Sequence, residues 1–153
     1  MGEEKDLKLE TRSVKGYWDI QYRWRFNTAY LARYAQGLKD KKILGTRCPK
    51  CQRVFVPPTY ICGRCLVEIK DWVELKGEAE LIAYTVAYSA ITGEELKEPN
   101  IIGMIKFEGA DSWSLAQIKE IKPEEVRIGI KLKPVWKEER KGQLGDIKYF
   151  VPV

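Results

Sequence analysis

The sequence Cys48-Pro49-Lys50-Cys51, followed after ten residues by Cys62-Gly63-Arg64-Cys65, holds all four cysteines of the 153-residue chain. Each C-x-x-C pair places two thiols on one tight turn, and residues 52–61 are enough for a short out-and-back ribbon. Such a ribbon brings the two turns together, so that four thiolates surround one Zn²⁺ at about 2.3 Å. We therefore predict a zinc ribbon whose ligands are Cys48, Cys51, Cys62 and Cys65.

Two disulfide bonds are the alternative for these cysteines, and they would require an oxidising compartment. The N-terminal residues 1–6 are acidic and polar, unlike an export signal or a transit peptide. No apolar run approaches the roughly 20 residues that a membrane-spanning helix needs. We expect a cytoplasmic protein without a membrane partner, in which the thiols stay reduced and bind zinc.

The predicted metal site is structural in type, because four cysteines close it whereas a catalytic zinc keeps one position open for water. The chain contains no histidine, which removes Ser-His-Asp and Cys-His machinery and the usual imidazole acid or base. With every cysteine assigned to the metal, no thiol nucleophile remains. We expect no catalytic residues, and a chain that is not an enzyme by itself.

The net charge of +5 is unevenly distributed along the chain. Residues 12–53 carry eleven Lys or Arg against Asp19 and Asp40, a net charge of +9. Residues 1–11 and residues 54–153 each carry a net charge of −2. The basic character therefore belongs to the segment that precedes and enters the ribbon, which favours an anionic partner or ligand there.

Residues 17–38 carry an aromatic side chain at every fourth position, which predicts a helix. A step of four drifts by about 40° on a helix of 3.6 residues per turn, so this stripe winds around the helix. Two interpretations stay open: the stripe packs on the core, or part of it docks on a partner protein or a ligand ring. Gly37 is a candidate C-cap. The aromatic residues are Trp18, Tyr22, Phe26, Tyr30 and Tyr34.

Beyond Cys65 the apolar residues alternate with a period of two, which predicts strands. Five of them follow in order, with a short helical turn near Pro123 between the third and the fourth. This order is that of an OB-fold, although strand number alone does not exclude another small β-barrel. We predict a mainly β protein with an N-terminal helix: residues 1–43 form a tail and the helix, 44–68 the ribbon and 69–153 the barrel. The strands are expected at residues 81–88, 101–107, 113–118, 130–136 and 147–151.

Several of these features occur together in one known family. The cysteine quartet, Pro57-Pro58 between its pairs, Ile128-Gly129 and the closing Phe150-Val151-Pro152 resemble the zinc-ribbon/OB-fold proteins that accompany thiolase-like enzymes, a domain of unknown function. The resemblance covers nearly the whole chain from about Tyr17. It implies a rubredoxin-like zinc ribbon with four cysteine ligands, acyl-CoA binding, and association with thiolase-superfamily enzymes such as acetyl-CoA acetyltransferase and hydroxymethylglutaryl-CoA synthase.

Three functions remain in competition. The first is a non-catalytic acyl-CoA-binding or scaffolding subunit, in which basic and aromatic side chains meet the phosphates and the adenine ring of CoA. The second is a nucleic-acid-binding module. The net charge of −2 over residues 54–153 disfavours binding through the barrel, and contacts through the helix and the ribbon stay open. The third is a structural protein with a zinc-stapled fold and a hydrophobic docking helix, which differs from the first only in not touching CoA. The candidate ligand-binding residues are Arg23, Arg25, Arg33, Lys41 and Lys42 for phosphates, and Tyr30 and Tyr34 for the ring.

Overall fold

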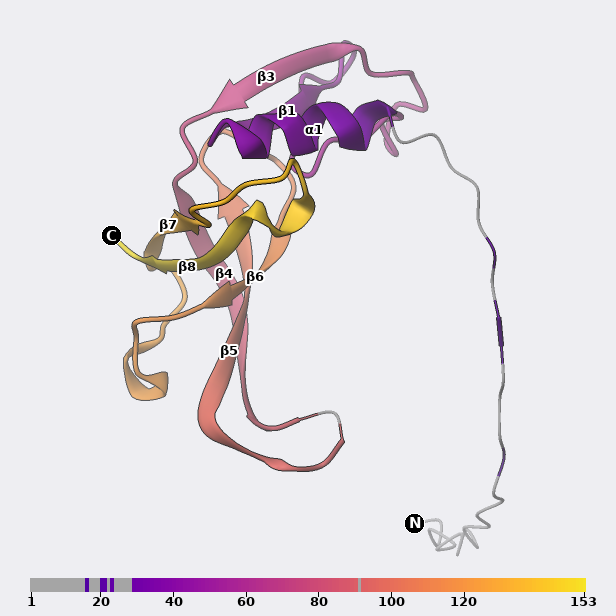
Figure 1. Cartoon of the computed structure of the whole chain (residues 1–153). Coiled ribbons are helices and arrows are strands. Elements are labelled where there is room, and N and C mark those ends of the chain that lie inside the picture. Colours follow the sequence, from indigo (N-terminus) through magenta and orange to yellow (C-terminus); the bar gives the residue numbers. More distant parts are fainter. Residues whose placement is uncertain (1–15, 17–19, 22, 24–28, 91) are drawn as a thin grey trace, which may run out of the picture.

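The computed structural model describes residues 16, 20, 21, 23, 29–90 and 92–153. One helix is followed by a small sheet and then by a barrel (Figure 1). In chain order the elements are α1 (Ala29–Lys39), β1 (Ile43–Arg47), β2 (Val54–Phe55), β3 (Asp71–Leu75), β4 (Ala79–Ser89), β5 (Glu95–Phe107), β6 (Ser114–Ile118), η1 (Pro123–Glu125), β7 (Lys131–Trp136), η2 (Leu144–Asp146) and β8 (Ile147–Pro152).

The helix is shorter than the sequence pattern predicts. It begins at Ala29, and Ile20, Gln21 and Arg23 have no regular secondary structure. Helices in proteins are held mainly by packing of their apolar face, and Ile20 is 51% exposed whereas Tyr34 and Leu38 are buried. The prediction of a helix was therefore wrong at residues 20, 21 and 23. Of the aromatic stripe, Trp18, Tyr22 and Phe26 lie outside the described residues.

The helix ends in a Schellman motif, and its left-handed residue is Lys41, with φ 60°. The N–H of Lys42 donates to the carbonyl of Gly37 at 2.8 Å, and the N–H of Lys41 donates to that of Leu38 at 3.0 Å. Gly37 is thus inside the helix, and its prediction as the C-cap was wrong. A Cβ on Gly37 would lie 2.7 Å from the side chain of Leu44, so glycine here lets β1 approach the helix.

The ribbon forms a three-stranded sheet in the order β2-β1-β3. Strand β1 pairs antiparallel with β3 over its whole length, from Ile43 opposite Leu75 to Arg47 opposite Asp71. It pairs with β2 at Thr46 and Arg47. The sheet of the ribbon therefore continues to Leu75, past the boundary expected at residue 68. The boundaries at residues 43 and 68 stay a proposal.

The five predicted barrel strands are confirmed as β4 to β8, which close in the order β4-β5-β6-β8-β7. This is the OB-fold order, with the single-turn helix η1 between β6 and β7. The register shifts between Leu81 and Ala83, where a bulge bends the long first strand. Strands β6 and β8 run parallel and pair at Ile118 and Phe150, so the barrel is weakly closed between them.

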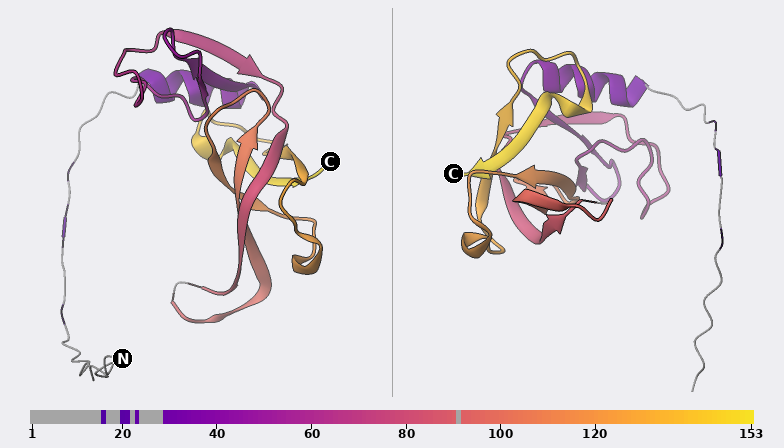
Figure 2. Two further views of the ribbon diagram at one scale, coloured as in Figure 1. Left: turned by 180° about the vertical axis from the view of Figure 1, so that it is seen from behind. Right: turned by 60° about the horizontal axis from the view of Figure 1, so that its bottom comes forward.

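Helix, ribbon and barrel share one hydrophobic core. Figure 2 shows the helix lying across the end of the barrel beside the ribbon sheet. The core takes Tyr34 and Leu38 from the helix, Ile43 and Val56 from the ribbon, and side chains from all five barrel strands. Because the helix, the ribbon and the barrel pack on one shared core, each of them fixes the position of the other two. The barrel residues are Leu81, Ile101, Ile105, Phe107, Ile118, Leu132 and Phe150.

Within the described part of the chain, no helix has both the length and the apolar character needed to cross a membrane.

Candidate metal centre and ligand groove

The two C-x-x-C turns have the same backbone geometry. In the first turn the N–H of Cys48 donates to the carbonyl of Arg53 at 2.9 Å, and the N–H of Gln52 donates to the carbonyl of Cys48 at 3.0 Å. In the second, Cys62 and Val67 make the equivalent bond at 3.0 Å. The residue after each pair has a left-handed backbone, with φ 60° at Gln52 and 53° at Leu66. This local chain reversal aims both thiols of a pair at one point.

The four thiols converge on a volume that fits a zinc ion. All four Sγ atoms lie within 4.8 Å of one another, and those of Cys51 and Cys62 are 3.7 Å apart. A tetrahedron with Zn–S bonds of about 2.3 Å has sulfur atoms about 3.8 Å apart. The four cysteines are free thiols rather than disulfides, and Cys48 and Cys62 are completely buried. The cofactor prediction is thus confirmed: these residues are positioned to hold a metal.

The electrostatics of the four thiols favour a cation among them. Burial opposes ionisation of Cys48, but hydrogen bonds from the backbone of Cys51 and Lys50 lower the pKa of its thiol to about 6. Burial, and then the neighbouring cysteines, raise the pKa of Cys65 to about 12. One thiolate therefore forms readily while another is suppressed by its neighbours. A divalent cation removes this conflict, and it would allow all four sulfurs to ionise as ligands.

Two of the predicted ligand-binding residues contact the ribbon. The hydroxyl of Tyr30 donates to the carbonyl of Ile69, and its ring lies 5.3 Å from that of Trp72 and 5.2 Å from that of Tyr60. The guanidinium carbon of Arg33 lies 4.6 Å from the centre of the Trp72 ring. These contacts attach the helix to β3 at Trp72 and to the segment around Tyr60 and Ile69.

The remaining predicted residues are dispersed. Tyr34 is only 5% exposed, and burial raises the pKa of its phenol to about 12. Lys41 is exposed in the turn that ends the helix, and Lys42 forms an ion pair with Glu74 at 3.0 Å. Arg23 is exposed, and Arg25 lies outside the described residues. Tyr34 also lines a groove between β6 and β8, and it is the member of the predicted set found there.

This groove, of about 270 Å³, lies where helix, ribbon and barrel meet. It follows the gap between β6 and β8, which pair at a single position. Its lining is mainly apolar, with Lys148 and Gln117 among its polar members. Apart from Tyr34, sequence reasoning did not single out the lining residues as ligand-binding, because no local motif marks them. Its main lining residues are Tyr34, Pro57, Leu115, Leu144, Lys148 and Tyr149.

Tyr149 connects the groove to a second hollow of about 610 Å³, because its side chain lines both. The ammonium groups of Lys119 and Lys148 lie 5.6 and 5.4 Å from the centre of its ring. Its hydroxyl donates to Glu120 at 3.1 Å, and this bond raises the pKa of the phenol. An aromatic ring flanked by two cations thus stands at one end of an apolar groove.

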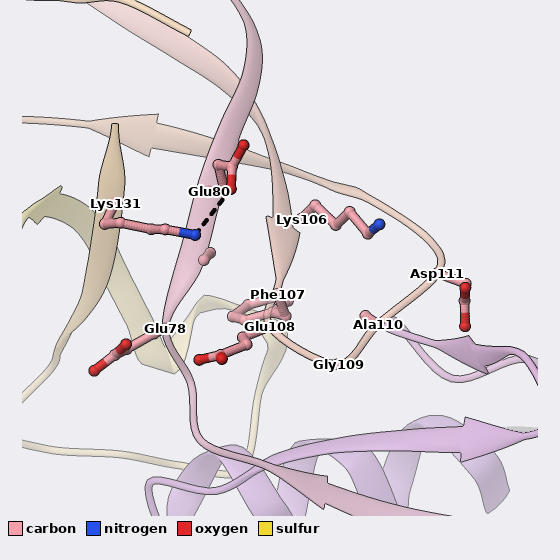
Figure 3. A pocket seen from close by; sticks show the side chains of 10 residues that line it. Glu78, Glu80, Lys106, Phe107, Glu108, Gly109, Ala110, Asp111 and Lys131 are labelled. Carbon is pink, nitrogen blue, oxygen red and sulfur yellow. Dashed lines mark hydrogen bonds and ion pairs between the residues drawn. The ribbon is translucent and has the colours of Figure 1, made fainter. Parts of the chain in front are cut away.

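A cavity of about 550 Å³ lies at the end of the barrel where β4, β5 and β7 meet (Figure 3). Charged side chains dominate its lining. Lys131 forms an ion pair with Glu80 at 2.8 Å, and this bond lowers the pKa of Glu80 and raises that of Lys131. The ion pair joins β7 to β4 where these strands close the barrel, which is a structural role. An apolar acyl chain does not fit this lining.

The comparisons with known proteins agree with this architecture. Residues 35–71 match the model of the rubredoxin-like zinc ribbon domain of ChsH2, and residues 72–137 match that of the ChsH2 C-terminal OB-fold domain. A solved structure of a DUF35 protein from Sulfolobus solfataricus is 34% identical, with a TM-score of 0.59. The alignment covers 67% of this chain and 75% of the Sulfolobus solfataricus protein. The chain belongs to the DUF35 family.

Two other DUF35 proteins are described as scaffold proteins. One, from Methanocaldococcus jannaschii, is 29% identical over 109 residues, which are 70% of this chain and 77% of the relative. The other, from Pyrococcus furiosus, is 23% identical over 111 residues, 72% and 80% of the two chains. An Ltp2-ChsH2(DUF35) aldolase structure shares the fold at 22% identity and a TM-score of 0.60, covering 85% of this chain and 98% of that one. The resemblance seen in the sequence is confirmed.

Proposed function

We propose that this DUF35 protein is a non-catalytic scaffold subunit that binds acyl-CoA and associates with a thiolase-superfamily enzyme, a thiolase or a hydroxymethylglutaryl-CoA synthase-like protein. Relatives described as scaffold proteins support the accessory role. The chain has no histidine, and its four cysteines converge on one metal site. Its proposed contribution is to hold a ligand and a partner enzyme in a fixed relation.

The observation that carries the acyl-CoA proposal is the groove between β6 and β8. The pantetheine arm of CoA is slim and largely apolar, and a groove of about 270 Å³ accommodates such an arm better than a whole nucleotide. Leu115 on β6 lines the groove and is 70% exposed. Phe150 on β8 also lines the groove, and it is buried in the core. Burial of an arm along these side chains would remove apolar surface from water.

The phosphates and the adenine ring are proposed to lie at the Tyr149 end. Lys119 and Lys148 are both close to this ring, and phosphate oxygens accept charge-assisted hydrogen bonds from ammonium groups. An adenine base can stack on the exposed part of an aromatic ring. The residues predicted from the sequence form a second candidate set, and the experiment separates the two. That set is Arg23, Arg25, Tyr30, Arg33, Tyr34, Lys41 and Lys42.

The ligand test is calorimetric titration of the full zinc-loaded chain with CoA and with a medium-chain acyl-CoA. Replacing Lys119 and Lys148 together by Ala should weaken binding of both by about tenfold or more. Leu115→Glu should weaken the acyl-CoA chiefly, because it places a charge beside the apolar arm. Lys133→Ala, at an exposed position on β7 outside the lining of the groove and of the hollow beside it, is the control.

Neutralising Arg23, Arg25 and Arg33 tests the alternative phosphate set in the same assay. If that triple variant loses affinity while the Lys119/Lys148 variant does not, CoA binds along the helix instead. If none of the variants differs from the wild type, or if CoA does not bind, the acyl-CoA proposal fails and the scaffold role stands alone.

The partner is tested by pull-down of the tagged chain from its native cytoplasm, where we expect it, with and without nuclease. A thiolase or synthase that co-purifies in both samples supports the proposal. Nucleic acid is the alternative partner, favoured by the exposed Lys50, Arg53 and Arg64 on the two C-x-x-C turns. In that case the co-purifying material disappears with nuclease, and RNA or DNA binding falls steeply between low and moderate salt.

A further inference from the structure

The β4–β5 hairpin extends well beyond the barrel (Figures 1 and 2). Strand β7 accompanies β4 at Ala79 and Glu80, and β6 accompanies β5 from Ile101 to Ile105. Farther out, β4 and β5 pair with each other, with Ala87 opposite Asn100 and Ser89 opposite Glu95. We call residues 87–90 and 92–100 the arm. A two-stranded ribbon without further packing is marginally stable in water, so a surface that packs against it would stabilise it.

The two edges of the arm have opposite chemistry. Along β5 the sequence is Glu95-Leu96-Lys97-Glu98-Pro99, and both charges and proline are devices that discourage another strand from pairing. Residues 81–92, which begin in β4 and continue past its end at Ser89, contain no charged residue, no proline and no glycine. About a third of all residues in the chain are charged, so this neutral run of twelve is unusual. The β4 edge therefore lacks the charges and proline that discourage strand pairing. The register does shift between Ala87 and Ser89, but the extra residues of this irregularity lie on β5, where four residues separate Glu95 from Asn100 and one separates Ala87 from Ser89 on β4.

The β4 edge is covered near the barrel and open farther out. Leu81 exchanges backbone hydrogen bonds with the loop before β7, donating to Ile130 at 3.0 Å and accepting from Gly129 at 2.8 Å. The hydroxyl of Tyr84 donates a hydrogen bond to the carbonyl of Val126 at 3.0 Å. From Thr85 to Ser89, none of the segments that the structure describes pairs with the side of β4 that faces away from β5.

We propose that Thr85–Ser89 pairs antiparallel with the same segment of a second copy of this chain, about a two-fold axis at Ala87. This register places Val86 opposite Tyr88 and Thr85 opposite Ser89, each pair occurring twice. An aromatic residue opposite a β-branched one, and Thr opposite Ser, are favourable cross-strand pairs. In a strand that pairs with its own copy, charges of the same sign face each other and repel. The segment Thr85–Ser89 contains no charged residue, so this repulsion does not arise. Tyr88, 61% exposed in the single chain, gains a partner.

The proposed dimer is a weak one. A pair of five-residue strands buries less than the about 1,200 Å² typical of stable interfaces, so association is expected at micromolar concentration and above. The first test is sedimentation velocity of the zinc-loaded full chain from about 5 to 500 µM. The expected result is a concentration-dependent shift from 17.7 kDa toward twice that mass. A chain that stays monomeric over this range overturns the proposal.

A charge placed on the axis tests the register. Ala87→Lys opposes two ammonium groups and should weaken the dimer by about tenfold or more. An equal mixture of the Ala87→Lys and Ala87→Glu variants should restore it, because opposite charges then meet. Thr92→Lys, which adds the same charge in the turn beyond the paired segment, should dimerise like the wild type. A dimer that survives Ala87→Lys unchanged, or a mixture that stays monomeric, refutes this pairing.

Hydrogen exchange of the unaltered chain avoids the risk that Ala87→Lys unfolds the arm. The amides of residues 85–89 should exchange more slowly at high than at low protein concentration, while those of residues 95–98 should not change. If the former become protected only when an enzyme partner is added, the edge binds a foreign strand and the self-pairing proposal is wrong.

Discussion

Val54 in the ribbon and Asp111 in the turn between β5 and β6 are joined by two hydrogen bonds. The N–H of Val54 donates to the carboxylate of Asp111 at 2.9 Å, and the N–H of Asp111 donates to the carbonyl of Val54 at 2.7 Å. Close by, the hydroxyl of Ser112 accepts from the N–H of Val56 at 2.7 Å and donates to its carbonyl at 2.9 Å. These four bonds fix the barrel turn against β2 and so orient the metal centre relative to the barrel.

We predict that Asp111→Ala lowers the free energy of unfolding by about 1–2 kcal/mol, because the N–H of Val54 loses its acceptor in a partly buried site. Urea denaturation followed by tryptophan fluorescence measures the change. Asp71→Ala, at the exposed end of β3, is the control and should change stability by no more than about 0.5 kcal/mol. Equal stability of the two variants would show that the junction does not need this bond.

Metal removal should unfold the ribbon before the barrel. The ribbon's own buried cluster consists of Cys48, Cys62 and Ile69, which is too small to persist without the ion. We expect one zinc per chain by atomic emission, and faster amide exchange over residues 44–66 after chelation. Amides of the barrel core, such as those of Ile105 and Leu132, should remain protected. A metal-free chain with a fully protected ribbon would falsify the structural role of the site.

The left-handed Lys41 predicts a stabilising substitution. A side chain at φ 60° is strained, and glycine is the preferred residue at this point of a Schellman motif. Lys41→Gly should raise the free energy of unfolding by about 0.5–1 kcal/mol, after the entropy of glycine in the unfolded chain is subtracted. Lys39→Gly, inside the helix, should lower it by about 0.5–1 kcal/mol. Thermal denaturation measures the stability of both variants. A Lys41→Gly variant less stable than the wild type would contradict the Schellman motif at Lys41.

Asp146 predicts a pH dependence of stability. Burial disfavours its carboxylate, but the N–H groups of Lys141, Gln143 and Gly142 donate to it and lower its pKa below the ordinary 3.8. A group whose pKa is lower in the folded state stabilises the fold above its unfolded pKa. That stability is lost as the pH falls from about 4 through the folded value.

Asp146→Asn should therefore lower the unfolding midpoint at pH 7 and flatten the decline in stability below pH 4. Denaturant unfolding from pH 7 to pH 2 measures both effects. Asp71→Asn, at an exposed position, serves as the control with an unaltered profile. If Asp146→Asn keeps the full acid sensitivity of the wild type, other carboxylates cause it.

Arg140 extends the same loop to the helix. Its Nε donates to the carbonyl of Lys39 at 2.8 Å, and its Nη1 donates to the carbonyls of Lys137 and Glu138. The loop that Asp146 holds therefore binds the C-terminal end of α1. Because Leu144 of this loop lines the groove, loosening it at Asp146 should also widen the groove.

The amino-acid sequence by itself determined the metal site and the strand order. Each C-x-x-C turn is built by hydrogen bonds within six residues, as between Cys48 and Arg53, so its geometry is written locally. The alternation of apolar residues likewise sets the strands, because a strand with one buried face must repeat every second residue.

Only the tertiary structure decided what the aromatic and glycine residues do. Tyr34 enters the core and the groove because β8 lies beside β6, and Gly37 is needed because Leu44 approaches the helix. The helix starts at Ala29 because packing against the ribbon and barrel, rather than its periodicity, holds it. Val54 and Asp111 are 57 residues apart. Contacts between such distant residues depend on how the elements assemble, which local sequence patterns do not encode.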